Sequence, residues 1–150
     1  MSLSIAHHAL PFSRQSEKYS AAWSPHALRT LLLLGCLASV AATAWIGDPS
    51  AYVRADPEHA FLLRGMAAIK ACLVVASVGV SLWRLGHALP QSTAAAYLVG
   101  SWLMAGATML IWQLSFIALA ALVFHVGMFM LLFVAWRDQG VKLPRFRDAL

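Results

Sequence analysis

Charged residues are scarce in this sequence, and acidic residues are absent from its long apolar runs. Only 11% of the 150 residues are charged and six are Asp or Glu, whereas 61% are hydrophobic and the mean hydropathy is +0.71. A soluble chain of this composition could not keep its surface hydrated, whereas long uncharged runs are typical of membrane spans. The composition therefore predicts an integral membrane protein and excludes a soluble globular domain.

Cysteine is also rare, and no proline interrupts the interior of an apolar run. The two cysteines, Cys36 and Cys72, lie within apolar runs and lack ligand-type spacing, so we expect neither a disulfide framework nor a zinc site. The sequence contains no HExxH motif, no phosphate-binding glycine loop and no recognisable nucleophile–base pair. We therefore expect a protein that is not an enzyme.

Four apolar segments are long enough to cross a hydrocarbon core about 30 Å thick. The predicted spans are residues 27–46, 57–85, 94–112 and 115–136, flanked by tails at residues 1–26 and 137–150. Because an isolated strand cannot satisfy its backbone in lipid, the expected fold is all-α, with four transmembrane helices in a compact bundle.

The predicted helix ends rest on local sequence signals. Ser24-Pro25 and Asp56-Pro57 each place a capping side chain before a proline at the first helical position. Gly86 and Pro90 are expected to end the second span, and Ser92 or Thr93 to cap the third. Only residues 113–115 separate the last two spans, which predicts a tight antiparallel hairpin.

Lysine and arginine gather on one side of this predicted topology. That side holds Arg14, Lys18, Arg29, Arg84, Arg137, Lys142, Arg145 and Arg147. The opposite side holds Arg54, with Arg64 able to reach it. The positive-inside rule therefore predicts that both termini are cytoplasmic, in a bacterial-type inner membrane, and it accounts for the charge of +5 without a nucleic-acid partner.

Aromatic and basic side chains near the span ends predict contacts with the lipid interface. The residues expected there are Trp45 and Trp112 on the outer side, Trp83 and Trp136 on the inner side, and the arginines Arg64 and Arg84. Tyr97 is also expected in the inner aromatic belt.

Small residues predict the faces through which the helices pack, because helices in lipid associate by close backbone approach. The predicted faces are Gly35, Ser39 and Thr43 in the first span, Ala96, Gly100, Ser101 and Ala105 in the third, and Ala118, Ala121 and His125 in the fourth.

Lys70 is the most unusual residue of the spans, because it lies near the middle of the second one. An ionisable side chain at that depth is costly and usually faces a bundle interior, a cavity or a partner. Since no acidic residue lies within a span, three explanations remain open. Burial deprotonates Lys70, its side chain reaches an interface, or its anion comes from a lipid, a cofactor or a partner subunit.

His125 is predicted at a similar depth in the fourth span, so Lys70 and His125 form a candidate binding pair for a lipid, a cofactor or a partner anion. Ser77 and Ser81 share a helical stripe with Lys70, and Thr108 and Met66 are further possible contributors. A histidine inside a membrane most often bonds a neighbouring helix. Haem ligation by His125 with a methionine, or quinone binding, is the alternative, so the cofactor stays open.

The function expected from these features is that of a small non-catalytic membrane subunit or accessory protein of a larger complex, of the respiratory or other redox kind. Its expected partners are membrane lipids and protein subunits, and a homo-oligomer is possible. Two alternatives remain: a carrier of an anionic or amphipathic solute, stand-alone or homo-oligomeric, and a haem- or quinone-binding membrane cytochrome.

Overall fold

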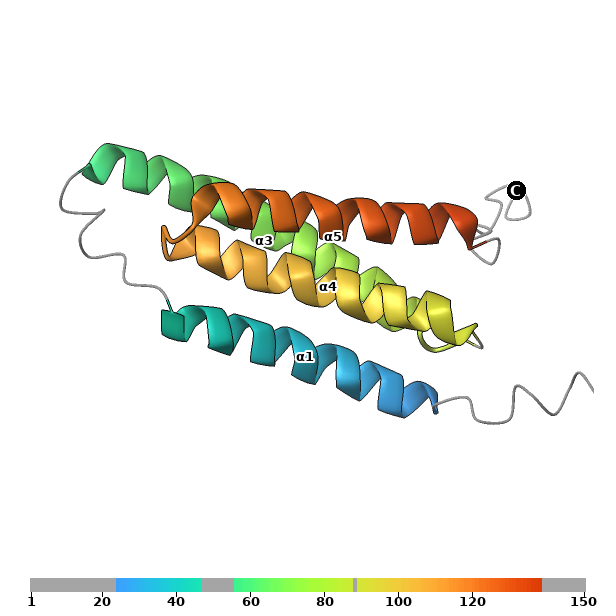
Figure 1. Ribbon diagram of the computed structural model, residues 1–150. Coiled ribbons are helices and arrows are strands. Elements are labelled where there is room, and N and C mark those ends of the chain that lie inside the picture. Colours follow the sequence, from blue (N-terminus) through green and yellow to red (C-terminus); the bar gives the residue numbers. More distant parts are fainter. Residues whose placement is uncertain (1–23, 47–55, 88, 139–150) are drawn as a thin grey trace, which may run out of the picture.

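The structure is a computed structural model, and it describes residues 24–46, 56–87 and 89–138. These residues form four α-helices and no strand: α1 (Pro25–Ile46), α3 (Pro57–Arg84), α4 (Gln91–Trp112) and α5 (Ile117–Arg137). All four are long and apolar enough to cross a membrane. The helices alternate in direction, so the start of α1 and the end of α5 lie at the same end of the molecule (Figure 1). We call it the terminal end.

Helix α4 is the centre of the fold. It carries eleven buried residues among its 22, whereas α1 carries one, α3 three and α5 four. Helices α1 and α5 lie on opposite sides of α4, and α3 packs on it as well (Figure 1). Direct contact between α1 and α3 is slight. The arrangement is three helices around a fourth, which leaves the outer faces of α1, α3 and α5 exposed.

The predicted starts of the first two helices are confirmed. The Ser24 side chain accepts from the Ala27 amide at 3.2 Å, and the Asp56 side chain accepts from the His59 amide at 3.0 Å. These bonds satisfy helical N–H groups that have no partner within the helix.

The starts of α4 and α5 differ from the prediction, and the predicted caps Ser92 and Thr93 lie inside α4. Helix α4 begins at Gln91 with Pro90 as its N-cap, three residues before the expected start, because the extended ψ of 143° at Pro90 suits that position. Helix α5 begins at Ile117, because Leu114 and Phe116 adopt left-handed φ values of 55° and 50° and turn the chain.

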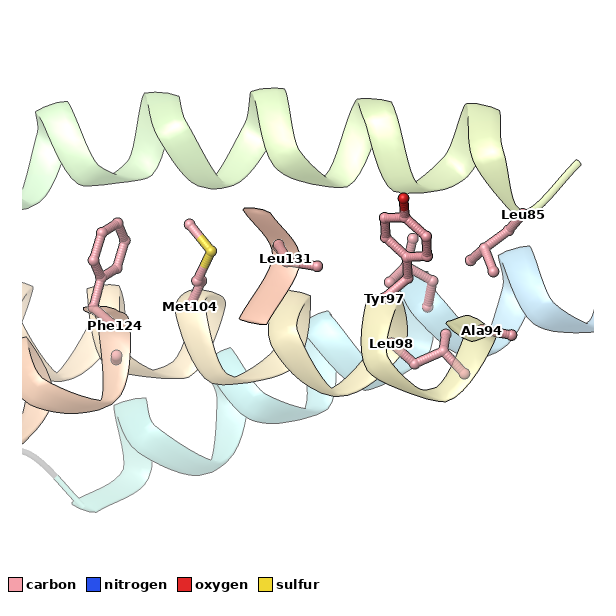
Figure 2. Close-up of a cluster of buried hydrophobic side chains, with 9 residues drawn as sticks. Leu85, Ala94, Tyr97, Leu98, Met104, Phe124 and Leu131 are labelled. Atoms are coloured by element: carbon pink, nitrogen blue, oxygen red, sulfur yellow. The ribbon is translucent and has the colours of Figure 1, made fainter. Parts of the chain in front are cut away.

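The core lies along the inward faces of α1, α3 and α5 where they meet α4. Figure 2 shows its main side chains, which are Leu85, Ala94, Tyr97, Leu98, Met104, Phe124 and Leu131. Tyr97 is only 1% exposed, and its ring points toward α3 rather than into an aromatic belt (Figure 2). The prediction for Tyr97 was wrong because α4 is surrounded by the other helices.

Glycines set the closest helix contacts. A Cβ on Gly35 of α1 would overlap the Trp102 indole of α4, whose Nε1 donates to the Leu32 carbonyl at 3.2 Å. A Cβ on Gly127 of α5 would lie 2.8 Å from the Gly100 carbonyl oxygen of α4. Both contacts therefore depend on the missing side chain.

The predicted small face of α1 is confirmed, since Ser39 and Thr43 pack against Gly106 of α4. The predicted face of α5 is wrong. Its buried residues are Ala120, Phe124, Gly127 and Leu131, whereas Ala118 and His125 are exposed. The actual face follows the large Phe124 and Leu131 with Gly127 between them, and it is turned away from the stripe of small residues that includes Ala118.

Candidate functional site

Four polar and basic side chains of α3 lie on one inward face. Lys70 and Ser77 are half-buried, Ser81 is 1% exposed, and the Arg84 side chain is 11% exposed. The predicted stripe of Lys70, Ser77, Ser81 and Arg84 is therefore inward-facing, and we call these four residues the α3 polar stripe. Their spacing keeps them on one side of the helix, facing α4 and α5.

Lys70 finds an aromatic partner within the chain. Its Nζ lies 4.1 Å from the centroid of the Phe124 ring, and Phe124 is 1% exposed. A desolvated cation–π contact contributes about 2 kcal/mol, which is less than the several kcal/mol that a charged group costs near a bilayer centre. Among the described residues, no carboxylate forms an ion pair with Lys70. Phe124 thus orients the lysine and offsets only part of that cost.

His125 contacts the same Phe124 from another direction, edge to face at a centroid distance of 5.7 Å. Its Nδ1 lies 2.6 Å from the Ala121 carbonyl oxygen, which can only accept, so Nδ1 carries the proton. Phe124 takes the inward position, and the next residue along a helix is turned about 100° away. His125 is therefore exposed, and it does not share an interior cavity with Lys70.

The other predicted contributors are also separated. The Thr108 hydroxyl is buried and donates to the Met104 carbonyl of its own helix at 2.8 Å. Met66 is 49% exposed on α3. Ser81 is placed against α4, where its Oγ lies 3.4 Å from the Ser101 Oγ. Because Ser101 donates its single proton to the Tyr97 carbonyl, Ser81 is the donor in this pair.

A buried ion pair at the terminal end was not predicted from the sequence. The Arg84 guanidinium donates to both carboxylate oxygens of Asp138: from Nε to Oδ2, and from Nη2 to Oδ1 at 2.7 Å. Both side chains are about nine-tenths buried. Tyr97 of α4 lies within electrostatic range of both groups. We call Arg84, Asp138 and Tyr97 the terminal cluster.

The expected contact of Arg84 with the lipid interface stays a prediction, and within the chain its guanidinium is directed at Asp138. The predicted topology contains the information from which this pair could have been predicted. Helices α3 and α5 run in the same direction, so Arg84 and Asp138, at their C-terminal ends, reach the same level.

A second arginine joins α1 to α3 at the terminal end. Arg29 Nε donates to the Leu82 carbonyl oxygen at 3.0 Å, near the C-terminus of α3. Cations are favoured there because the helix dipole is negative at that end. A Cβ on Gly86 would overlap the Arg29 guanidinium, so a larger residue at this position would displace the end of the Arg29 side chain.

The remaining predicted interface residues lie near helix ends. Trp45 and Trp136 are largely exposed, at 92% and 83%, and Trp83 and Trp112 are about half exposed. Arg64 differs from these exposed tryptophans, because part of its side chain is buried. Its guanidinium carbon lies 5.8 Å from the Trp112 ring centroid, and its Nε is buried without a hydrogen-bond partner among the described residues.

No group of three or more His, Cys, Asp or Glu side chains gathers within residues 24–46, 56–87 and 89–138. If His125 ligates a haem, it must do so through Nε2, since Nδ1 is bonded to its own helix.

No protein-family description, curated protein or solved structure matches this chain. The fold and the α3 polar stripe define a class only: an α-helical protein whose four described helices are each able to cross a membrane.

Proposed function

We propose that this chain is a small non-catalytic subunit or accessory protein of a larger membrane complex, of the respiratory or other redox kind. The observation that supports this most directly is the outward position of His125. It is the ninth residue of the 21 in α5, so it lies near the middle of the helix and on its exposed side. Lipid tails offer no hydrogen-bonding group at that depth, whereas a partner helix does.

The surface around His125 suits a second helix. Ala118 is exposed and Ala121 half-buried on the same stripe, and small residues allow two backbones to approach closely. We call Ala118, Ala121 and His125 the α5 outer stripe. The partner supplies a hydrogen-bonding side chain or carbonyl to the free Nε2 of His125.

Lys70 adds a second reason for an external partner. Its contact with Phe124 leaves a net cost, which an anion from outside the chain offsets. That anion is a lipid phosphate, a cofactor carboxylate, a quinone oxygen or an acidic residue of the partner. In this proposal both termini are cytoplasmic, in a bacterial-type inner membrane.

A carrier of an anionic solute is the second candidate, and the α3 polar stripe is the observation that favours it. Carriers commonly use broken helices near the bilayer midplane. All four described helices run without a break, which favours the subunit.

The first experiment is purification in mild detergent, followed by mass spectrometry and an absorption spectrum. Stoichiometric partner chains are the expected result. A colourless oligomer without a partner would favour the carrier function. A Soret band in the isolated chain would establish a cytochrome instead.

The lysine is tested by comparing Lys70→Met with Arg64→Met. We expect Lys70→Met to reduce the co-purified partner or ligand severalfold, because the midplane cation is lost, while Arg64→Met changes it little. Recovery is measured by quantitative mass spectrometry. Equal and negligible losses in both variants would rule out the external anion.

His125→Leu tests the α5 outer stripe, with His26→Leu at the exposed start of α1 as the matched control. We expect a loss of partner only for His125→Leu. Full recovery of the partner with this variant would place the interface elsewhere.

A further inference from the structure

We infer that a cleft between α1 and the first half of α4 binds one glycerophospholipid, with its phosphate at the mouth and one acyl chain inside. The cleft has a volume of about 760 Å³ and lies at the terminal end. Pockets of about 300–1,000 Å³ commonly hold small ligands. This inference does not depend on the proposed subunit function, since the cleft can hold a lipid whether or not a protein partner is bound.

The inner wall of the cleft is a continuous hydrocarbon surface. Leu28 and Leu31 line it from α1, and Leu98, Val99 and Trp102 line it from α4. Trp102 is fixed by its packing on Gly35 and by its bond to the Leu32 carbonyl, so this wall is preformed. Such a wall matches a flexible alkyl chain and offers nothing to a polar solute.

The depth of the cleft matches one membrane leaflet. From Gln91 to Trp102 the α4 helix advances eleven residues, or about 16 Å at 1.5 Å per residue. Half of a hydrocarbon core of about 30 Å is about 15 Å. The cleft therefore reaches from the helix ends to about the bilayer midplane, which is the extent of one acyl chain.

The mouth of the cleft is polar and favours an anion. Ser24, His87 and Gln91 line it, and α4 begins there. The N-cap of α4 is Pro90, which provides no side-chain cap, and the positive end of the helix dipole lies at the mouth. A phosphate is the anion that such a helix start commonly binds.

His87 adds a directed group at the mouth. Its Nδ1 lies 3.1 Å from the Trp83 carbonyl oxygen and donates to it, which leaves Nε2 for a ligand. Arg29 lies next to Gly86, the residue before His87, and donates to the Leu82 carbonyl, so it adds positive charge beside the mouth.

The cleft joins a mouth that suits an anionic head group to an apolar wall that suits an acyl chain. This combination favours a phospholipid over other occupants. A second copy of this chain would present a helix face, which does not match a concave apolar cleft with a polar mouth. An isoprenoid quinone has the tail but lacks the phosphate that the helix start favours. The cleft is polar at the helix ends and apolar toward the middle of the bundle, and a phospholipid in a membrane has its polar and apolar parts in the same order.

The experiment is native mass spectrometry of the delipidated full-length protein after addition of phosphatidylglycerol or of diacylglycerol with the same acyl chains. We expect one phosphatidylglycerol per chain, retained at least tenfold more than diacylglycerol, because only the former carries a phosphate. Ala95→Trp, which fills the cleft from an exposed lining position, is expected to abolish retention.

Ala76→Trp is the matched control, since it places the same side chain at an exposed position of α3 outside the cleft. Circular dichroism and gel filtration of both variants check folding. His87→Ala provides a second test that does not depend on filling the cleft, and it should reduce the preference for phosphatidylglycerol severalfold while leaving acyl-chain binding intact.

Three results would overturn the inference: no lipid on the wild-type protein, equal retention by Ala95→Trp and Ala76→Trp, or equal retention of the two lipids. Retention of a quinone or of a second chain that Ala95→Trp abolishes would assign the cleft to that occupant instead.

Discussion

At the scale of single residues, the basic side chains of this protein are held by different kinds of partner. Arg84 has a carboxylate, Arg29 a helix-end carbonyl, Lys70 an aromatic ring, and Arg64 the Trp112 ring. The strength of these partners decreases in roughly that order, because a bidentate ion pair combines charge with two aligned hydrogen bonds. Lys70 has only a neutral ring as its internal partner and lies near the middle of its helix, so it is the cation for which we propose an external anion.

The ion pair of the terminal cluster is tested by a double-mutant cycle. Removing one partner by Arg84→Met or Asp138→Asn leaves an uncompensated buried group, which costs about 3–5 kcal/mol in buried pairs. We expect the double variant to lose much less stability than the sum of the two single variants. The measurement is the free energy of unfolding in mixed micelles.

Arg137→Met serves as the control for that cycle, since Arg137 is exposed beside Asp138 and its removal should change the free energy by no more than about 0.5 kcal/mol. Additive effects of Arg84→Met and Asp138→Asn would show that the two side chains are energetically independent.

At the scale of helices, α1, α3 and α5 all pack on α4, so α4 determines how the bundle is arranged. Its contact with α5 is closest where Gly100 meets Gly127, and its contact with α1 is closest where Trp102 covers Gly35. In lipid there is little hydrophobic gain from helix association, so these close contacts carry much of the packing energy.

Two glycine substitutions separate close packing from helix propensity. Gly127→Ala forces a Cβ to within 2.8 Å of the Gly100 carbonyl oxygen, and we expect a loss of about 1–3 kcal/mol from overpacking. Gly79→Ala has no atom within 4 Å of the new Cβ and should be neutral or gain up to about 1 kcal/mol of helix propensity. Thermal unfolding in detergent measures both, and a similar shift in the two variants would contradict the α4–α5 contact.

At the scale of the whole molecule, the described ends of the chain share one end of the bundle, and that end also carries the terminal cluster, Arg29 and the mouth of the cleft. An end that combines cations, a helix start and a lipid-sized cleft is suited to contact with anionic headgroups. The positive-inside rule would place this end in the cytoplasm.

The orientation is tested with reporter fusions after residue 150 and with a cysteine introduced within residues 47–55. We expect a C-terminal green fluorescent protein to be fluorescent and a C-terminal alkaline phosphatase to be inactive. A cysteine introduced at Ser50 should react with a membrane-impermeant thiol reagent added from outside. An active C-terminal phosphatase would reverse the proposed topology.

The number and order of the helices could be predicted from the sequence because each depends on local properties. The apolar runs, the Ser24-Pro25 and Asp56-Pro57 starts and the inward stripe of Lys70, Ser77, Ser81 and Arg84 all follow from neighbours along one helix. The tails, the loop at residues 47–55 and the tryptophan contacts with lipid stay predictions, since they lie outside the described residues or need a membrane.

The tertiary structure alone decided which helix is central and how each helix is rotated. The rotation of α5 illustrates the reason: Ala118, Ala121 and His125 look like a packing face, but Phe124, Gly127 and Leu131 fit α4 better. Such a choice depends on the shape of a surface far away in the sequence, as does the pairing of Arg84 with Asp138 across 54 positions. Periodicity fixes which residues share a face, and only packing against another helix determines whether that face is turned inward or outward.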